Sequence, residues 1–133
     1  MNVMLVEDDA LLRETLAEDM VLTGLNVTQA PNAEAALEAI IAAENGSTSP
    51  FILVTDVNLG DGVDGLALVV EARRRWPEVG VVVMTGDPAN IEGRCFDPRE
   101  VLLLKPMGLS QVADAVHGLA AQLRLNLIDA DSR

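Results

Sequence analysis

Four short runs of apolar residues recur along the chain, and each is continuous rather than alternating. They are Val3–Val6, Phe51–Thr55, Val79–Met84 and Val101–Leu104. A strand that is apolar along its whole length is covered on both faces, which is typical of a parallel sheet. A fifth run, Leu25–Ala30, alternates apolar and polar residues and indicates an edge strand with one wetter face.

Helical periodicity fills the intervals between these runs, because apolar residues recur there at spacings of three or four. The predicted helices are Asp9–Leu22, Ala33–Glu44, Val63–Arg75 and a last one from near Gly108 to about residue 124. Asn32 is placed to cap the second helix. Strands and helices therefore alternate, and short right-handed crossovers give a doubly wound α/β sheet with helices on both faces.

One interval departs from this pattern. Between Gly86 and Val101 the chain carries Pro88, Gly93 and Pro98. Proline lacks an amide donor and clashes with the preceding helical turn, so we expect the fourth helix of the series to be short or irregular.

Length and charge narrow the class of protein. The chain has 133 residues, which suits one domain, placed at residues 1–124, and a frayed tail at residues 125–133. Acidic residues outnumber basic ones by 21 to 9, so direct binding to nucleic acid is not expected. There is no signal-peptide pattern, no apolar stretch of roughly 18 residues that could span a membrane, and a single cysteine. We expect a cytoplasmic protein that does not enter a membrane.

Polar side chains directly follow four of the five predicted strands. They are Glu7, Asp8 and Asp9 after the first strand, Asp56 after the third, Thr85 after the fourth and Lys105 after the fifth. In a doubly wound sheet ligands bind beyond the carboxyl ends of the strands, where the strand order reverses. We therefore expect these side chains to meet at one edge of the sheet. Asp9 is the exception, since a residue in its position more often begins a helix.

The chemistry follows from the residue types. Clustered carboxylates repel one another unless a cation joins them, and a site of oxygen ligands alone suits a hard ion such as Mg²⁺. A metal and a lysine beside one carboxylate can neutralise an incoming phosphoryl group and orient it. This pattern predicts that one of the carboxylates is a nucleophile that forms an acyl phosphate.

Four segments, in this order, resemble the signatures of the response-regulator receiver family. They are Leu5-Val6-Glu7-Asp8-Asp9, Val54-Thr55-Asp56-Val57-Asn58-Leu59, Val83-Met84-Thr85-Gly86 and Leu103-Leu104-Lys105-Pro106. The resemblance implies a flavodoxin-like sheet of strand order 2-1-3-4-5. It also implies a signalling switch of a two-component or phosphorelay system, phosphorylated by a histidine kinase or phosphotransfer protein and acting on a downstream protein partner. Enzymatic activity would be limited to its own phosphorylation and dephosphorylation.

The resemblance also implies a role for each site residue. Asp56 is the phospho-acceptor, and Mg²⁺ or Mn²⁺ is held by Glu7, Asp8, Asp56 and the backbone carbonyl of Asn58.

Two further residues would contact the phosphoryl group in that scheme: Thr85 through its hydroxyl, as the switch residue, and Lys105 through its ammonium. The peptide between Lys105 and Pro106 is expected to be cis, which only an X-Pro bond adopts at low cost. Leu102 stands where the family often has a rotating aromatic, which puts the usual coupling between that aromatic and the threonine in doubt.

Three alternatives remain open. The chain could be a receiver excised from a hybrid histidine kinase. Gly60-x-Gly62-x-x-Gly65 satisfies a dinucleotide-binding fingerprint, as in an oxidoreductase, but it does not follow its strand directly, and Asp61 and Asp64 would repel a pyrophosphate. A hydrolase with an aspartate nucleophile would need a carboxylate where Asn58 stands.

Overall fold

The computed structural model describes residues 2–44, 51–57, 59, 64–87, 89, 99–105 and 107–131. Its elements, in chain order, are β1 (Asn2–Val6), α1 (Ala10–Leu22), β2 (Asn26–Ala30), α2 (Ala33–Glu44), β3 (Phe51–Asp56), α3 (Gly65–Arg75), β4 (Gly80–Thr85), β5 (Glu100–Leu104) and α4 (Leu109–Asp131). Each strand and helix predicted from the periodicity is found, and apart from the end of the last helix the bounds differ by at most two residues.

The strands form one parallel sheet of order β2-β1-β3-β4-β5, as predicted. The chain leaves β1 for β2 on one side of the sheet and reaches β3 on the other, so the strand order reverses between β1 and β3. Every residue of β4 is buried, which agrees with its continuous apolar run. In β2 only Ala30 is fully buried, as expected of an edge strand.

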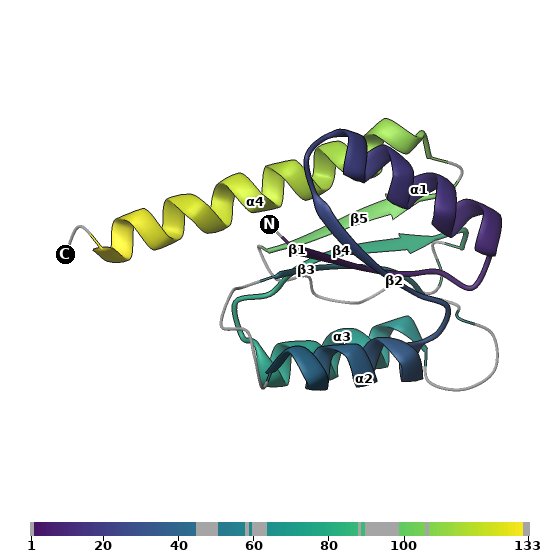
Figure 1. Ribbon diagram of the computed structural model, residues 1–133, viewed down its shortest axis with the longest axis horizontal. Coiled ribbons are helices and arrows are strands. Elements are labelled where there is room, and N and C mark those ends of the chain that lie inside the picture. The colour runs from purple at the N-terminus through teal and green to yellow at the C-terminus, as the bar shows by residue number, and fades with distance from the viewer. Residues whose placement is uncertain are drawn as a thin grey trace.

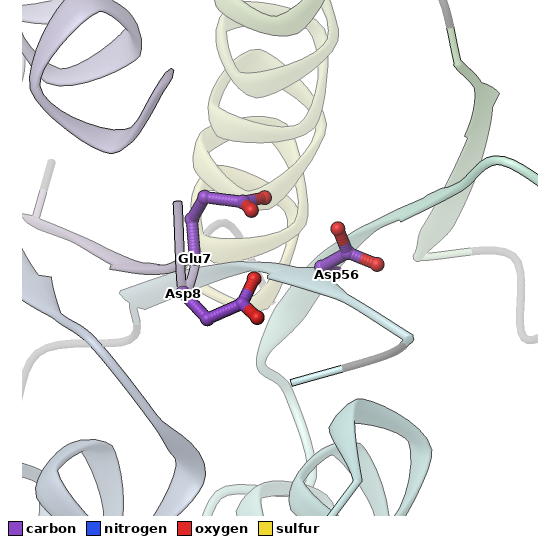
Figure 2. A group of neighbouring side chains, drawn as sticks. All are labelled: Glu7, Asp8 and Asp56. Carbon is purple, nitrogen blue, oxygen red and sulfur yellow. The ribbon is translucent and has the colours of Figure 1, made fainter. Parts of the chain in front are cut away.

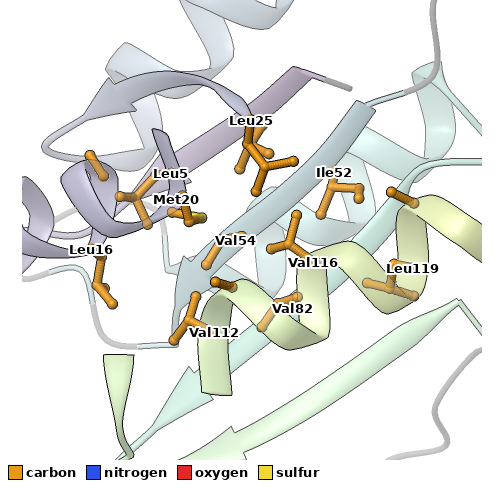
Figure 3. Packing of buried hydrophobic residues seen from close by; sticks show 14 of the residues in the cluster. Leu5, Leu16, Met20, Leu25, Ile52, Val54, Val82, Val112, Val116 and Leu119 are labelled. Atoms are coloured by element: carbon orange, nitrogen blue, oxygen red, sulfur yellow. The ribbon is translucent and has the colours of Figure 1, made fainter. Parts of the chain in front are cut away.

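Two helices cover each face of the sheet (Figure 1). On one face α1 and α4 pack against the strands through an aliphatic cluster that includes Leu16, Met20, Val54, Val82 and Val116 (Figure 3). On the other face α2 and α3 bury a second cluster. Because both faces are covered, side chains can reach solvent chiefly at the sheet edges, and the polar residues at the strand ends occupy one of these edges.

Asp9 and Asn32, which were expected from the sequence to lie at helix starts, cap α1 and α2. Asp9 Oδ1 accepts a hydrogen bond from the amide of Leu12 (3.1 Å), and Asn32 Oδ1 accepts one from the amide of Ala35 (2.8 Å). Each cap satisfies an amide that has no partner within its helix. The expectation that Asp9 begins the first helix is therefore confirmed.

The end of α4 differs from the expectation. The helix continues to Asp131, past the boundary at residue 124 after which the chain was expected to fray, and Figure 1 shows it running beyond the sheet. The physical reason lies in the composition: leucine, alanine, glutamine and arginine dominate residues 119–128, and all are good helix formers.

The predicted irregular helix between β4 and β5 falls mostly on residues 88 and 90–98, which lie outside the described residues. That expectation stays a prediction. In the part of the chain that the structure describes, no helix combines the length and apolar character that a membrane crossing requires.

Candidate functional site

The register of the sheet brings the strand ends level with one another. Val6 pairs with Thr55, Asp56 pairs with Met84, and Thr85 pairs with Leu104. The last residues of β3 and β4, Asp56 and Thr85, therefore lie level with Glu7 and Lys105, which directly follow β1 and β5. In this way Glu7, Asp56, Thr85 and Lys105, which are distant in the sequence, meet at the carboxyl edge of the sheet, as the sequence predicted.

The alternation of side chains along a strand decides which way these residues face. Leu5, Val54 and Leu103 lie two positions before Glu7, Asp56 and Lys105, respectively. All three pack under α1 and α4. Glu7, Asp56 and Lys105 have the same parity, so they point to the same face of the sheet. This common direction allows their charged groups to touch.

Three carboxylates come together beside the point where the strand order reverses. Glu7, Asp8 and Asp56 each place one oxygen within 4.8 Å of the others, and in Figure 2 the Glu7 and Asp8 side chains extend toward Asp56. Glu7 and Asp56 are buried, with exposed fractions of 1% and 6%, whereas Asp8 is exposed. Oxygen ligands in such an arrangement suit a hard divalent cation, and the exposed member leaves a path for the ion and its water.

Lys105 supplies positive charge to this cluster. Its Nζ forms an ion pair with Asp56 Oδ2 and lies 3.4 Å from Glu7 Oε2. Burial lowers the pKa of Lys105, but the hydrogen bond and charge of Asp56, together with Glu7, outweigh burial and raise the pKa above its usual value of 10.5. The ammonium therefore stays protonated and can offset negative charge at this edge.

The surroundings of Glu7 disfavour the charged form of its carboxyl. Burial, and after it the charge of Asp56, raises the pKa of the Glu7 carboxyl from 4.5 to about 7, although Lys105 acts in the opposite direction. The Glu7 carboxyl is therefore about half protonated at neutral pH when no divalent cation is bound. Metal binding at such a site should release that proton.

Thr85 is fully buried at the end of β4. Its hydroxyl donates to the carbonyl of Asp87 and accepts from the amide of the same residue, both at 3.1 Å. Closing this small turn places the hydroxyl at the same edge as the carboxylates. A contact between Thr85 and a phosphoryl group stays a prediction.

Two of the predicted site residues, Asn58 and Pro106, lie outside the described residues. The metal contact of the Asn58 carbonyl and the cis peptide before Pro106 therefore stay predictions. The same holds for Gly60 and Gly62 of the dinucleotide fingerprint.

Arg13 belongs to the surroundings of the site, and sequence reasoning missed it. Its Nη1 donates to the backbone carbonyl of Glu7 (2.9 Å), while the amide of Asp9 donates to Glu7 Oε1 (3.3 Å). These bonds tie the segment between β1 and α1 to the helix that follows. An arginine in an amphipathic helix gives no sequence signal for such a contact.

Comparison with known proteins agrees with this geometry. A family model described as the response regulator receiver domain matches residues 3–117. The response regulator protein FleR of Pseudomonas aeruginosa is 40% identical over 84 residues, which cover 63% of this chain and 16% of that protein.

Solved structures show the same fold. A response regulator receiver protein from Sinorhizobium medicae superposes with a TM-score of 0.78 at 24% identity, over 92% of this chain and 96% of that one. The receiver domain of the hybrid histidine kinase CckA gives a TM-score of 0.70 at 28% identity, over 90% of this chain and 98% of that one. The first curated relatives are longer proteins, of which the chain spans 16 to 36%.

Proposed function

Because this chain belongs to the response regulator receiver domain family, we propose that it is a switch operated by phosphorylation of Asp56 in the presence of Mg²⁺. Receiver domains act in two-component signalling and interact with histidine kinases or phosphotransfer proteins. The observation that carries the proposal is the position of the Asp56 carboxylate, which contacts the Lys105 ammonium and shares an acidic cluster with Glu7 and Asp8.

The residues present suit a hard divalent cation. Glu7, Asp8 and Asp56 offer oxygen atoms only. Burial, and after it the charge of Asp56, raises the pKa of Glu7, and a bound cation would offset the charge of these carboxylates. We propose that these three side chains, with the carbonyl of Asn58, hold Mg²⁺ or Mn²⁺. When bound, the metal supplies positive charge that offsets the charge of the phosphoryl oxygens.

The reaction proposed for this chain is a single displacement at phosphorus. A carboxylate oxygen of Asp56 attacks the phosphorus of a phosphohistidine, the O–P bond forms as the P–N bond breaks, and the donor imidazole keeps the electron pair. The Lys105 ammonium, which pairs with Asp56, then pairs with a phosphoryl oxygen. The Thr85 hydroxyl donates to another phosphoryl oxygen once it leaves the backbone of Asp87.

In this proposal, phosphorylation changes the affinity of the domain for a downstream protein partner. The domain comprises residues 1–124. It has no enzymatic activity beyond its own phosphorylation and dephosphorylation. The similarity to the CckA receiver supports an alternative, in which this chain is a receiver that works within a hybrid kinase. A cytoplasmic setting, without direct contact to nucleic acid or membrane, belongs to the same proposal.

The test is phosphorylation with a small acyl phosphate and Mg²⁺. We expect a metal-dependent label that is stable in acid and labile in base on the wild-type chain and on Asp114→Asn, a control at an exposed position of α4. Asp56→Asn should carry no label. Equal labelling of Asp56→Asn would refute the assignment.

A further inference from the structure

The backbone around Asp56 is held by three hydrogen bonds. Thr55 Oγ1 donates to the carbonyl of Asp56 (3.0 Å). The amide of Val57 donates to the carbonyl of Met84 (3.0 Å), and the carbonyl of Val57 accepts from the amide of Gly65 (2.9 Å). The peptides next to the proposed nucleophile therefore have little freedom to rotate.

Gly65 lets the first turn of α3 approach this backbone closely. A Cβ at Gly65 would lie 1.8 Å from the carbonyl oxygen of Asp56, 2.8 Å from its carbonyl carbon and 3.0 Å from Thr55 Oγ1. The φ angle of Gly65 is not positive, so its backbone conformation does not demand glycine. Glycine is needed at this position because α3 lies directly against the Asp56 peptide and leaves no room for a side chain.

Thr55 is unusual among the buried residues. The buried polar or charged side chains in the described part of the chain are Glu7, Thr55, Asp56 and Thr85. Three of these belong to the proposed site, whereas Thr55 precedes Asp56 on β3 and its side chain points to the opposite face. A buried hydroxyl is costly unless it is hydrogen-bonded, and this one bonds to the carbonyl of the residue that carries the reactive carboxylate.

We propose that Thr55 and Gly65 are positioning residues for phosphorylation. The Thr55 hydroxyl and the closely packed start of α3 fix the orientation of the Asp56 peptide from the face under α3. This orientation holds the Asp56 carboxylate toward Glu7 and Lys105 on the other face. Reactive groups gain rate when supporting contacts restrict them to the productive geometry. The inference rests on the proposed role of Asp56 as the phosphoryl acceptor.

The decisive comparison is between Thr55→Val and Thr55→Ser. Valine keeps the shape and loses the hydrogen bond, whereas serine keeps the hydroxyl and loses a methyl group. We expect the maximal rate of phosphorylation by a small acyl phosphate to fall about fivefold or more in Thr55→Val and to stay within about twofold of wild type in Thr55→Ser. A wild-type rate in Thr55→Val would overturn the inference. So would rates that follow the melting temperatures across the three proteins, because they would reflect stability alone.

Gly65→Ala tests the second contact, with Gly118→Ala as its control. A Cβ at Gly118 in α4 meets no atom within 4 Å. We expect the rate to fall about tenfold or more in Gly65→Ala and to be unchanged in Gly118→Ala. A folded Gly65→Ala protein with the wild-type rate would contradict the inference; if that variant does not fold, the comparison of Thr55→Val with Thr55→Ser decides.

An unlabelled wild type would overturn the proposed function itself, whereas a labelled wild type with a fully active Thr55→Val overturns only the positioning role.

Discussion

The Glu7→Gln substitution removes a carboxylate that the fold buries beside Asp56. Burial, and then the charge of Asp56, raises the pKa of Glu7 from 4.5 to about 7. When the pKa is higher in the folded than in the unfolded chain, the stabilisation is complete below the unfolded value and is lost as pH rises through the folded value. When a chelator has removed divalent cations, the free energy of unfolding of the protein should therefore fall between pH 4.5 and somewhat above pH 7.

The size of this loss follows from the two pKa values. Each pH unit between them corresponds to about 1.4 kcal/mol, so the interval from 4.5 to about 7 gives about 3 kcal/mol. For a chain of 133 residues this amounts to about 10 °C in Tm. Glutamine has no charge to bury, so Glu7→Gln should be the more stable protein at pH 8 in chelator, and the two proteins should converge near pH 4.5.

Thermal unfolding followed by circular dichroism across this pH range measures the effect. Glu14→Gln, at an exposed position of α1, is the matched control and should follow the wild type at every pH. Mg²⁺ at pH 8 should raise the Tm of the wild type more than that of Glu7→Gln, because a bound ion stabilises only a folded chain that keeps its ligands. Equal Tm values for wild type and Glu7→Gln at pH 8 in chelator would refute the reasoning, as would a gain of the same size in Glu14→Gln.

Other substitutions test single contacts. Lys105→Ala removes the ammonium that pairs with two carboxylates, and the rate of phosphorylation by a small phosphodonor should fall about 100-fold; a wild-type rate would contradict its role. Asp8→Asn should weaken Mg²⁺ binding about tenfold or more in calorimetric titration, and an unchanged affinity would exclude Asp8 as a ligand. Arg73→Ala takes a partner from Glu100, whose side chain is 0% exposed, and should lower the free energy of unfolding in urea by about 3 kcal/mol. Arg74→Ala, at a side chain 65% exposed, should change it by about 0.5 kcal/mol or less.

The fold could be predicted because its signals are local and periodic. The continuous apolar run at Val79–Met84 marked β4, which is buried along its whole length, and the alternation at Leu25–Ala30 marked the edge strand β2. The site could be predicted because parallel strands end at a common edge. The strand assignment put Glu7, Asp56 and Lys105 at one edge, and the strand order implied by the family resemblance put β1, β3 and β5 close together within the sheet.

Contacts that depend on packing could not be read from the sequence. Thr55 looks like an ordinary strand residue, since its β-branched side chain favours a strand whether or not the hydroxyl finds a partner. Gly65 suggested a nucleotide-binding loop, but the structure gives it a steric reason, the approach of α3 to Asp56. Arg73 and Glu100 pair across 27 positions of sequence, and no periodicity connects them. The helix was not expected to continue to Asp131, although the residues at this end of α4 are good helix formers.

The most direct test of the central claim is to locate the phosphorylated residue. After reaction with a small acyl phosphate and Mg²⁺, borohydride reduces an aspartyl phosphate to homoserine, and peptide mass spectrometry identifies its position. We predict homoserine at position 56, formed only when Mg²⁺ is present and absent from Asp56→Asn. Homoserine at another aspartate, or an unchanged position 56 in a wild-type chain that carries the label, would contradict the account.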